Sequence, residues 1–311
     1  MAYTDLLSGI FDRNELKNME AKEQYLSEMR DIASDFWSKY QTQEIIVDYT
    51  DTKNQEVYLL RYFPFYTQPV RFVLDELKGD DVCLPEVELL EACFLGCGPG
   101  PEVIGLMWHL LSSEAVTTML AAKMVDIAAE TWGYSREIIR EFVAEHYWQP
   151  GLVEYESFAG SYLDNRDLKK IDVEGSHLAV VQFCLNEISR DAQSEVEDNI
   201  LELFSRLSPG AIAIVIERDR YPQTRQMLKN MYQKADGIEC LKPITAAEPT
   251  SDVVDNRTML DGVPSIIKDN LFWDGRGSVP GWAKDRDEVF DKGLMFAKDI
   301  KFIWVAFQIG L

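Results

Sequence analysis

The stretch that decides the fold class is VELLEACFLGCGPGPEVIGL, residues Val87–Leu106. An apolar run ends at Leu95, three glycines follow within five residues, and a segment with helical spacing comes next. Glycine permits a tight turn and lets ligand atoms approach the backbone where a Cβ would clash. The free N–H groups of the next helix, at its positive dipole end, attract an anion. The stretch therefore predicts a strand, a ligand-binding turn and a helix.

Three kinds of ligand use such a turn. A nucleoside triphosphate is excluded, because a P-loop closes on Gly-Lys-Ser/Thr and Gly100 is followed by Pro101 and Glu102. A dinucleotide fingerprint needs glycine or alanine at position 101, and an acid beside a pyrophosphate is unfavourable. Pro101 instead suits the first position of a helix. S-adenosylmethionine remains, since it carries no phosphate and its anionic group is a single carboxylate.

Apolar runs alternate with amphipathic segments from Val87 onward, which predicts an α/β fold with a mostly parallel sheet. Residues 240–300 are rich in loop signals and give few others. We expect strands at 88–95, 119–125, 152–157, 177–183, 211–216 and 301–309, and helices at 101–113, 133–147, 190–207 and 222–235.

The N-terminal part reads as mostly helical. Residues 5–40 carry apolar side chains at spacings of three and four among many charges. The segment 43–50 fits either a strand or a helical turn, and a further helix ends near Gly79. We therefore expect a helical cap or lid at 1–85 and a sheet domain at 86–311.

Composition limits the partners. The 311 residues carry a formal net charge of −22, and a surface this acidic repels phosphate backbones and anionic lipid headgroups. No apolar stretch approaches the roughly 20 residues of a spanning helix, and the acidic, weakly apolar N-terminus does not predict a secretory signal. Five cysteines without a C-x-x-C pair favour free thiols in a reducing cytoplasm. We expect no nucleic acid, no membrane and, from three scattered histidines, no metal site; oligomeric state leaves no signal.

Four landmarks follow the order found in class I S-adenosylmethionine-dependent methyltransferases. They cover about 86–311, and together they imply a Rossmann-like class I fold: a mostly parallel seven-stranded sheet with helices on both faces, and S-adenosyl-L-methionine as cofactor. FLGCGPGPE (94–102) resembles motif I, AAKMVDIA (121–128) the second strand with its ribose-binding acid, HLAVVQFCLNEI (177–188) the fourth strand with its loop, and LSPGAIAIVIERD (207–219) the turn into strand five.

One position departs from the family pattern. The family usually has an acid two residues before the first glycine, where this chain has Phe94. Either another residue supplies that contact, or cofactor binding is weakened. The second outcome would fit a non-catalytic binding or regulatory module that kept the fold.

An aromatic segment, YLLRYFPFYTQPVRF (58–72), precedes the glycine turn. It fits either a helix pair packed on the sheet or a lid, in which tyrosine rings face the sulfonium and Arg61 or Arg71 holds a carboxylate. Its placement also loosely resembles ribosome-associated methyltransferase-like proteins of bacteria and mitochondria, although the C-terminal cysteine cluster of that family is missing. The expected cofactor-binding residues are Gly96, Cys97, Gly98, Gly100, Asp126, Gln182, Phe183, Tyr62 and Arg61.

Methyl displacement from a sulfonium requires alignment and exclusion of water, and a hydroxyl or amine acceptor also requires a base. The candidate catalytic residues are Glu187, Asn186, Tyr66 and His146. We expect O-, N- or C-methylation of a small molecule, because an aromatic-lidded pocket suits small ligands. A protein or RNA methyltransferase and an NAD-dependent oxidoreductase stand as alternatives. The loop 269–288, with two tryptophans, either joins the acceptor pocket or anchors itself to the core.

Overall fold

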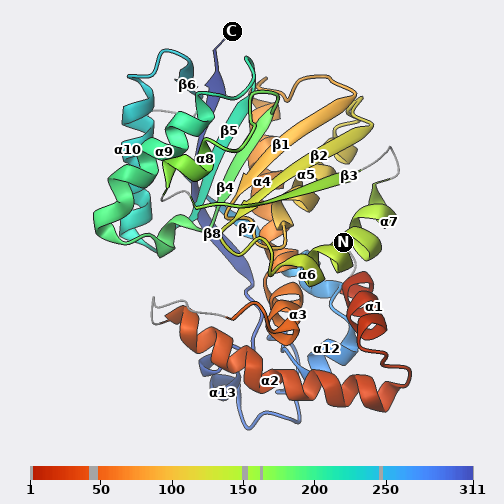
Figure 1. Cartoon of the computed structure of the whole chain (residues 1–311). Coiled ribbons are helices and arrows are strands. Elements are labelled where there is room, and N and C mark those ends of the chain that lie inside the picture. The colour runs from red at the N-terminus through yellow and green to blue at the C-terminus, as the bar shows by residue number, and fades with distance from the viewer. Residues whose placement is uncertain (1–2, 42–47, 149–152, 162–163, 245–247, 311) are drawn as a thin grey trace. The chain divides into compact units, whose positions relative to one another are not determined.

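A computed structural model describes residues 3–41, 48–148, 153–161, 164–244 and 248–310 (Figure 1). The chain forms two compact units. Unit 1 comprises residues 1–65, 131–147 and 255–300, and unit 2 comprises residues 66–130, 148–254 and 301–311. Most of the segment 43–50 lies outside the described residues. The division into a cap at 1–85 and a sheet domain at 86–311 stays a prediction.

The sheet follows the order β3-β2-β1-β4-β5-β8-β6, and β7 also pairs with β8 (Figure 1). The first five strands run parallel, whereas β8 is antiparallel to both β5 and β6. The strands are β1 Leu89–Leu95, β2 Met119–Asp126, β3 Val153–Ala159, β4 Leu178–Gln182, β5 Ile212–Arg218, β6 Leu241–Pro243, β7 Thr250–Asp255 and β8 Asp299–Ile309.

The predicted α/β class and all six predicted strands are confirmed. Most of them are apolar runs long enough to be buried between helices, whereas the edge strand β3 is largely exposed. The short β6 and the half-exposed β7 were not predicted. Three residues in β6 carry no periodicity, and β7 has only two apolar residues, the adjacent Val253 and Val254, so it shows no apolar alternation.

Helices cover both faces of the sheet, as predicted. On one face, α9 (Gln193–Phe204) and α10 (Pro222–Ala235) pack on a cluster of buried strand residues that includes Val181 and Val215. On the other face, the ring of Phe72 in α4 (Phe63–Gly79) lies 5.7 Å from that of Phe302 in β8. Helix α5 (Pro101–Ser112) packs against α4. The two helices are so close that a Cβ on Gly105 of α5 would lie 2.3 Å from Thr67 O of α4.

Three predicted helical segments differ in detail. The helical character expected at 5–40 is confirmed, but it is divided between two helices. α1 (Tyr3–Arg13) and α2 (Met19–Gln41) are separate, because Glu15 takes φ = 55° and the Asn18 side chain caps α2 by accepting from Ala21 N–H. The helix at 133–147 is interrupted by a π-helical turn, and that at 190–207 begins as a 3₁₀ turn. These segments are α6 Gly133–Ile138, η1 Ile139–Ala144, α7 Glu145–Tyr147 and η3 Arg190–Ala192.

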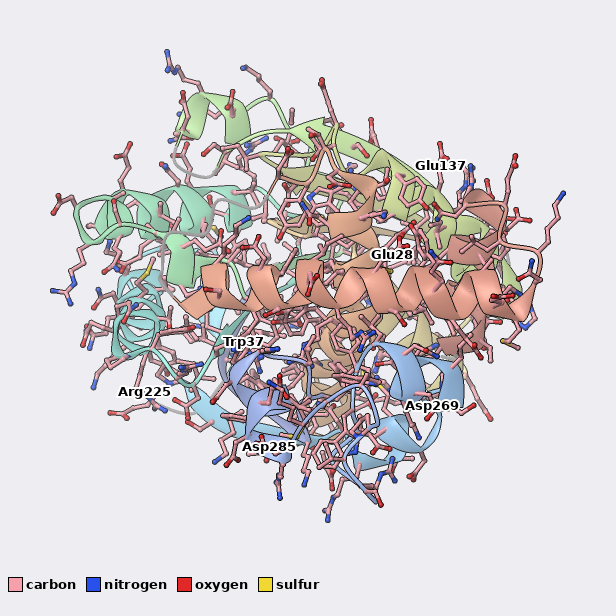
Figure 2. The ribbon with its side chains drawn as sticks, turned by 90° about the horizontal axis from the view of Figure 1, so that it is seen from below. Glu28, Trp37, Glu137, Arg225, Asp269 and Asp285 are labelled. Carbon is pink, nitrogen blue, oxygen red and sulfur yellow. The ribbon has the colours of Figure 1, made fainter. Side chains whose placement is uncertain are left out.

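Unit 1 is helical and draws on three stretches of chain. Figure 2 shows α2 from the side, running across the view, and labels its residues Glu28 and Trp37. The last stretch packs beside α2, since Gly293 leaves no room for a Cβ against the Trp37 ring. The other helices are α3 Thr52–Arg61, α11 Arg257–Asp261, α12 Ser265–Asn270 and α13 Arg286–Asp291. None of the helices in the described ranges is long and apolar enough to cross a membrane.

Candidate functional site

The glycine turn lies at the carboxyl end of β1, and α5 begins at Pro101 as predicted. Gly96, Gly98 and Gly100 have φ of 64°, 52° and 87°, a left-handed backbone that side chains with a Cβ rarely adopt. Gly96 N–H donates to Val125 O of β2 at 2.8 Å. A Cβ on Gly100 would lie 2.4 Å from the terminal methyl group of Met124, a flexible side chain that can shift, so the left-handed φ is what requires glycine here.

Asp126, the last residue of β2, holds the turn in place. Its Oδ2 accepts from Gly98 N–H at 2.8 Å, and its Oδ1 accepts from Ala128 N–H at 2.8 Å. The side chain is nearly buried, and each carboxylate oxygen keeps a second lone pair for a ligand hydroxyl. The ends of two adjacent strands are therefore joined around an acid with a fixed orientation.

A buried network links the end of β4 to the start of α5. The Gln182 amide, Nε2, donates to Tyr66 O at 2.8 Å and to Glu102 Oε1 at 3.1 Å. Gln182 and Glu102 are each 3% exposed. Sequence reasoning used Glu102 only to exclude a phosphate ligand and missed it as a site residue. The available signal was an acid in the first helical turn after the glycines.

Phe183 follows β4 with φ = 56°, a conformation uncommon for a residue other than glycine. Its ring centroid lies 4.9 Å from that of Tyr66. The Arg218 guanidinium, at the end of β5, lies 5.4 Å from the Tyr66 ring and 5.2 Å from the Phe183 ring. Arg218 was not predicted, although its position directly after a predicted strand is a signal for the ligand edge of the sheet.

Carboxylates gather at this edge. Burial raises the pKa of Glu217, which is fully buried, to about 8, even though its Oε1 accepts from Leu185 N–H at 2.6 Å. Desolvation by the surrounding protein atoms, and then repulsion from the Asp126 charge, raise the pKa of Glu187 to about 7. The Glu187 side chain is nevertheless exposed at the surface, so water screens part of that effect. Asn186 lies half-buried in the same 3₁₀ turn, η2 (Leu185–Glu187).

The other predicted residues divide between the units. Buried Cys97 lies in the glycine turn, with its Sγ 3.9 Å from Val125 O. Arg61, Tyr62 and His146 belong to unit 1. There the Arg61 guanidinium donates to Met295 O, the Tyr62 ring stacks on a neighbouring phenylalanine at 5.7 Å, and His146 is exposed. Their role in cofactor or acceptor binding stays a prediction.

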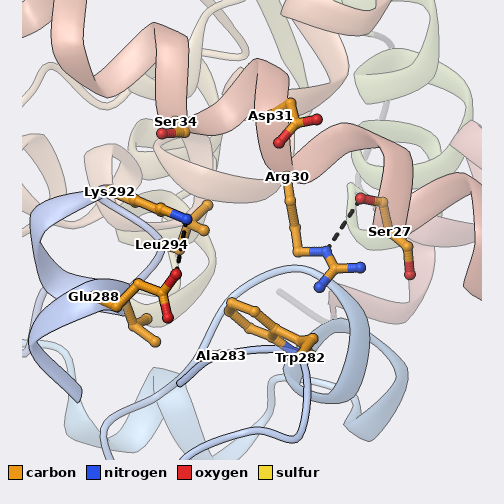
Figure 3. A pocket seen from close by; sticks show the side chains of 10 residues that line it. Ser27, Arg30, Asp31, Ser34, Trp282, Ala283, Glu288, Lys292 and Leu294 are labelled. Atoms are coloured by element: carbon orange, nitrogen blue, oxygen red, sulfur yellow. Dashed lines mark hydrogen bonds and ion pairs between the residues drawn. The ribbon is translucent and has the colours of Figure 1, made fainter. Parts of the chain in front are cut away.

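The tryptophan loop lies in unit 1. Trp273 is buried and its indole N–H donates to Arg276 O at 2.9 Å, which anchors the loop. Trp282 lies 5.1 Å below the Arg30 guanidinium and borders a cavity of about 280 Å³ (Figure 3). The cavity is lined by Ser27, Arg30, Asp31, Ser34, Trp282, Ala283, Glu288, Val289, Lys292 and Leu294. Within the described part of the chain, no group of histidine, cysteine and acidic side chains is arranged to hold a metal ion.

No protein-family model and no curated protein sequence matches the chain. Solved structures of methyltransferases match most of it. One is a 1,6-didemethyltoxoflavin-N1-methyltransferase from Burkholderia thailandensis with 1,6-didemethyltoxoflavin and S-adenosylhomocysteine bound (TM-score 0.40, 11% identity, 90% of this chain and 88% of that chain). Another is an O-methyltransferase family protein from the same organism (TM-score 0.40, 12% identity, 93% of this chain and 71% of that chain). A third is an antibiotic-related methyltransferase (TM-score 0.35, 14% identity, 79% of this chain and 98% of that chain).

The strand order assigns the fold. Five parallel strands run β3-β2-β1-β4-β5, and an antiparallel strand, β8, lies between β5 and β6. The glycine turn follows the central strand β1, and the direction in which successive strands are added to the sheet reverses between β1 and β4. By the order and direction of its strands, the chain has the class I S-adenosylmethionine-dependent methyltransferase fold.

Proposed function

We propose that this protein is an S-adenosylmethionine-dependent methyltransferase that acts on a small-molecule acceptor. The observation that carries the proposal is the turn at 96–100, bonded at 2.8 Å from Gly98 N–H to the Asp126 carboxylate. Open α/β sheets bind ligands at this edge, beyond the carboxyl ends of their strands. A glycine turn tied to a strand-end acid suits a ligand with both an adenosyl group and ribose hydroxyls.

The residues present fit this cofactor. The glycines leave a backbone without Cβ atoms at the turn, so that ligand atoms can approach it closely. Asp126 is oriented to accept from ribose hydroxyls. Buried Glu102 in the first turn of α5 disfavours a phosphate, so the glycine turn favours an adenosyl ligand without one.

When bound, the cofactor supplies a methyl group activated by a sulfonium leaving group. The chain then has to align the acceptor and exclude water. Glu187 is the proposed base, because a carboxyl whose pKa is near 7 can take a proton from a hydroxyl or ammonium at neutral pH. Asn186, in the same turn, would orient the acceptor, and the Tyr66 and Phe183 rings would bound the methyl group. The net charge of −22 favours a small acceptor over a nucleic acid.

Calorimetry on the full chain tests the proposal, with S-adenosylmethionine and S-adenosylhomocysteine as titrants. We expect micromolar binding to the wild type and none to Gly98→Leu. Gly210→Leu is the matched control, since Gly210 also has a left-handed φ, 84°, and open space around it. Both variants therefore place a leucine in a strained left-handed backbone, but only Gly98→Leu changes the glycine turn. Wild-type affinity in Gly98→Leu would show that the cofactor site is misplaced.

Phe94 favours a second candidate, a non-catalytic binding or regulatory module. It is fully buried in β1, at the position where the family usually has an acid. The same titration separates the two functions, because a module that has lost the cofactor binds neither ligand. If the cofactor binds, release of S-adenosylhomocysteine over a panel of amines, phenols and carboxylic acids identifies the acceptor class.

A further inference from the structure

We infer that Gln182 and Glu102 form a seat for a primary ammonium group, that of the methionine part of the cofactor. The inference rests on the proposed function and assigns a part of its site that the sequence left open. The seat would supply, from β4 and α5, the contact that an acid at the Phe94 position usually provides.

The orientation of the Gln182 amide is fixed by its neighbours. Tyr66 O and Glu102 Oε1 are both acceptors, so the NH₂ group must face them and Oε1 must point elsewhere. Oε1 is buried, and no donor of the described residues reaches it. A buried acceptor without a donor is costly and rare in folded proteins. We therefore expect Gln182 Oε1 to accept a hydrogen bond from an N–H or O–H group of a ligand.

Strand register places this oxygen at the glycine turn. β1 and β4 pair in parallel, with Phe94 beside Val180 and Leu95 beside Val181. Gln182 is the next residue of β4, and Gly96 is the next residue after β1, where the turn begins. The end of β4 thus offers a polar group at the start of the turn, two residues beyond the partner of the buried Phe94.

Glu102 adds charge to the seat. Its carboxyl group lies in the first turn of α5 and accepts from the Gln182 amide at 3.1 Å, so a second acceptor lies one hydrogen bond away from the Gln182 side chain. An ammonium group carries a positive charge and three donors, and it can serve both acceptors at once. A hydroxyl has one donor and no charge, while a carboxylate or phosphate would meet only acceptors.

The test compares S-adenosylhomocysteine with its deaminated counterpart, which lacks only the α-amino group. The ratio of their dissociation constants, measured by calorimetry on the full chain, reports the contact to the ammonium. We expect a ratio of about ten to a hundred for the wild type, as for a buried charged hydrogen bond. Glu102→Gln keeps the shape and the acceptor for Gln182 but removes the charge, and Gln182→Met removes Oε1. Both should reduce the ratio to about one to three if the contact is lost.

Glu217→Gln is the matched control, because it replaces another buried carboxyl group at the same sheet edge with an amide and should leave the ratio unchanged. Purely structural damage would weaken both ligands equally and keep the ratio, so a wild-type ratio in both seat variants overturns the inference while the proposed function stands. A wild type that binds neither ligand overturns the proposed function and the inference with it. If Glu102→Gln fails to fold, the ratio measured for Gln182→Met decides alone.

Discussion

Glu217 gives a direct test of how the ligand edge of the sheet is built. It lies at the end of β5 with its side chain fully buried, and it accepts from Leu185 N–H in the turn that carries Glu187. Burial raises its pKa from 4.5 to about 8, so the folded protein holds it neutral at pH 7. The neutral Glu217→Gln variant keeps an acceptor for Leu185 N–H and cannot titrate.

The sign follows from proton linkage. Because the pKa is higher in the folded state, the stability from neutral Glu217 is complete below about pH 4.5 and is lost as pH rises through about 8. A shift of 8 − 4.5 = 3.5 units corresponds to about 5 kcal/mol over the whole range, of which about 2.5 kcal/mol falls between pH 5 and pH 7. The wild type should lose that much stability relative to Glu217→Gln over those two pH units.

Urea unfolding of both proteins, followed by tryptophan fluorescence from pH 5 to pH 8, measures the difference and cancels titrations that they share. Glu202→Gln is the control, because hydrogen bonding from Asn165 and Lys169 lowers the pKa of Glu202, so its contribution should stay nearly constant from pH 5 to pH 8. Its wild-type contribution is present above the unfolded pKa and is lost as pH falls. A wild-type minus Glu217→Gln difference that stays constant over this range would refute a buried, neutral Glu217.

Three further predictions concern packing, catalysis and the thiols. Gly105→Ala should destabilise the protein by about 1–3 kcal/mol and lower its melting temperature, because the new Cβ would lie 2.3 Å from a backbone oxygen of α4, whereas Gly79→Ala has open space and should change little. In Glu187→Gln, kcat/KM for the acceptor should fall by about 10²–10⁴-fold and lose the rise through about pH 7 that an ionising base gives the wild type; an unchanged pH profile would exclude Glu187 as the base. Exposed Cys83 should react first with a thiol reagent, while Cys93, whose pKa burial raises to about 12, should react only on unfolding, as mass mapping of the labelled peptides would reveal.

Much of the sheet could be predicted because its signals are local. A run such as LLEACFL fills a strand buried between helices, and the start of α5 follows from Pro101 after three glycines. Local signals failed where the cause was not periodicity. The break between α1 and α2 depends on a left-handed Glu15 and the Asn18 cap, and β6 is too short to show a pattern.

The candidate site was predictable only in part. Gly96, Gly98, Gly100 and Asp126 could be found because a turn and a strand end are read from a few consecutive residues. Their connection, a hydrogen bond from Gly98 N–H to the Asp126 carboxylate, joins residues 28 apart and required the strand pairing. The predicted roles of Arg61, Tyr62 and His146 remain untested.

The sequence by itself determined the strand–turn–helix unit and the parallel sheet, because apolar periodicity and glycine conformations are properties of short stretches. The tertiary structure alone decided which polar groups meet at the ligand edge: Glu102 and Gln182 share a hydrogen bond across 80 residues, and burial gives Glu217 its raised pKa. Desolvation and hydrogen-bond geometry depend on what packs around a side chain, and residues distant in the chain supply those neighbours.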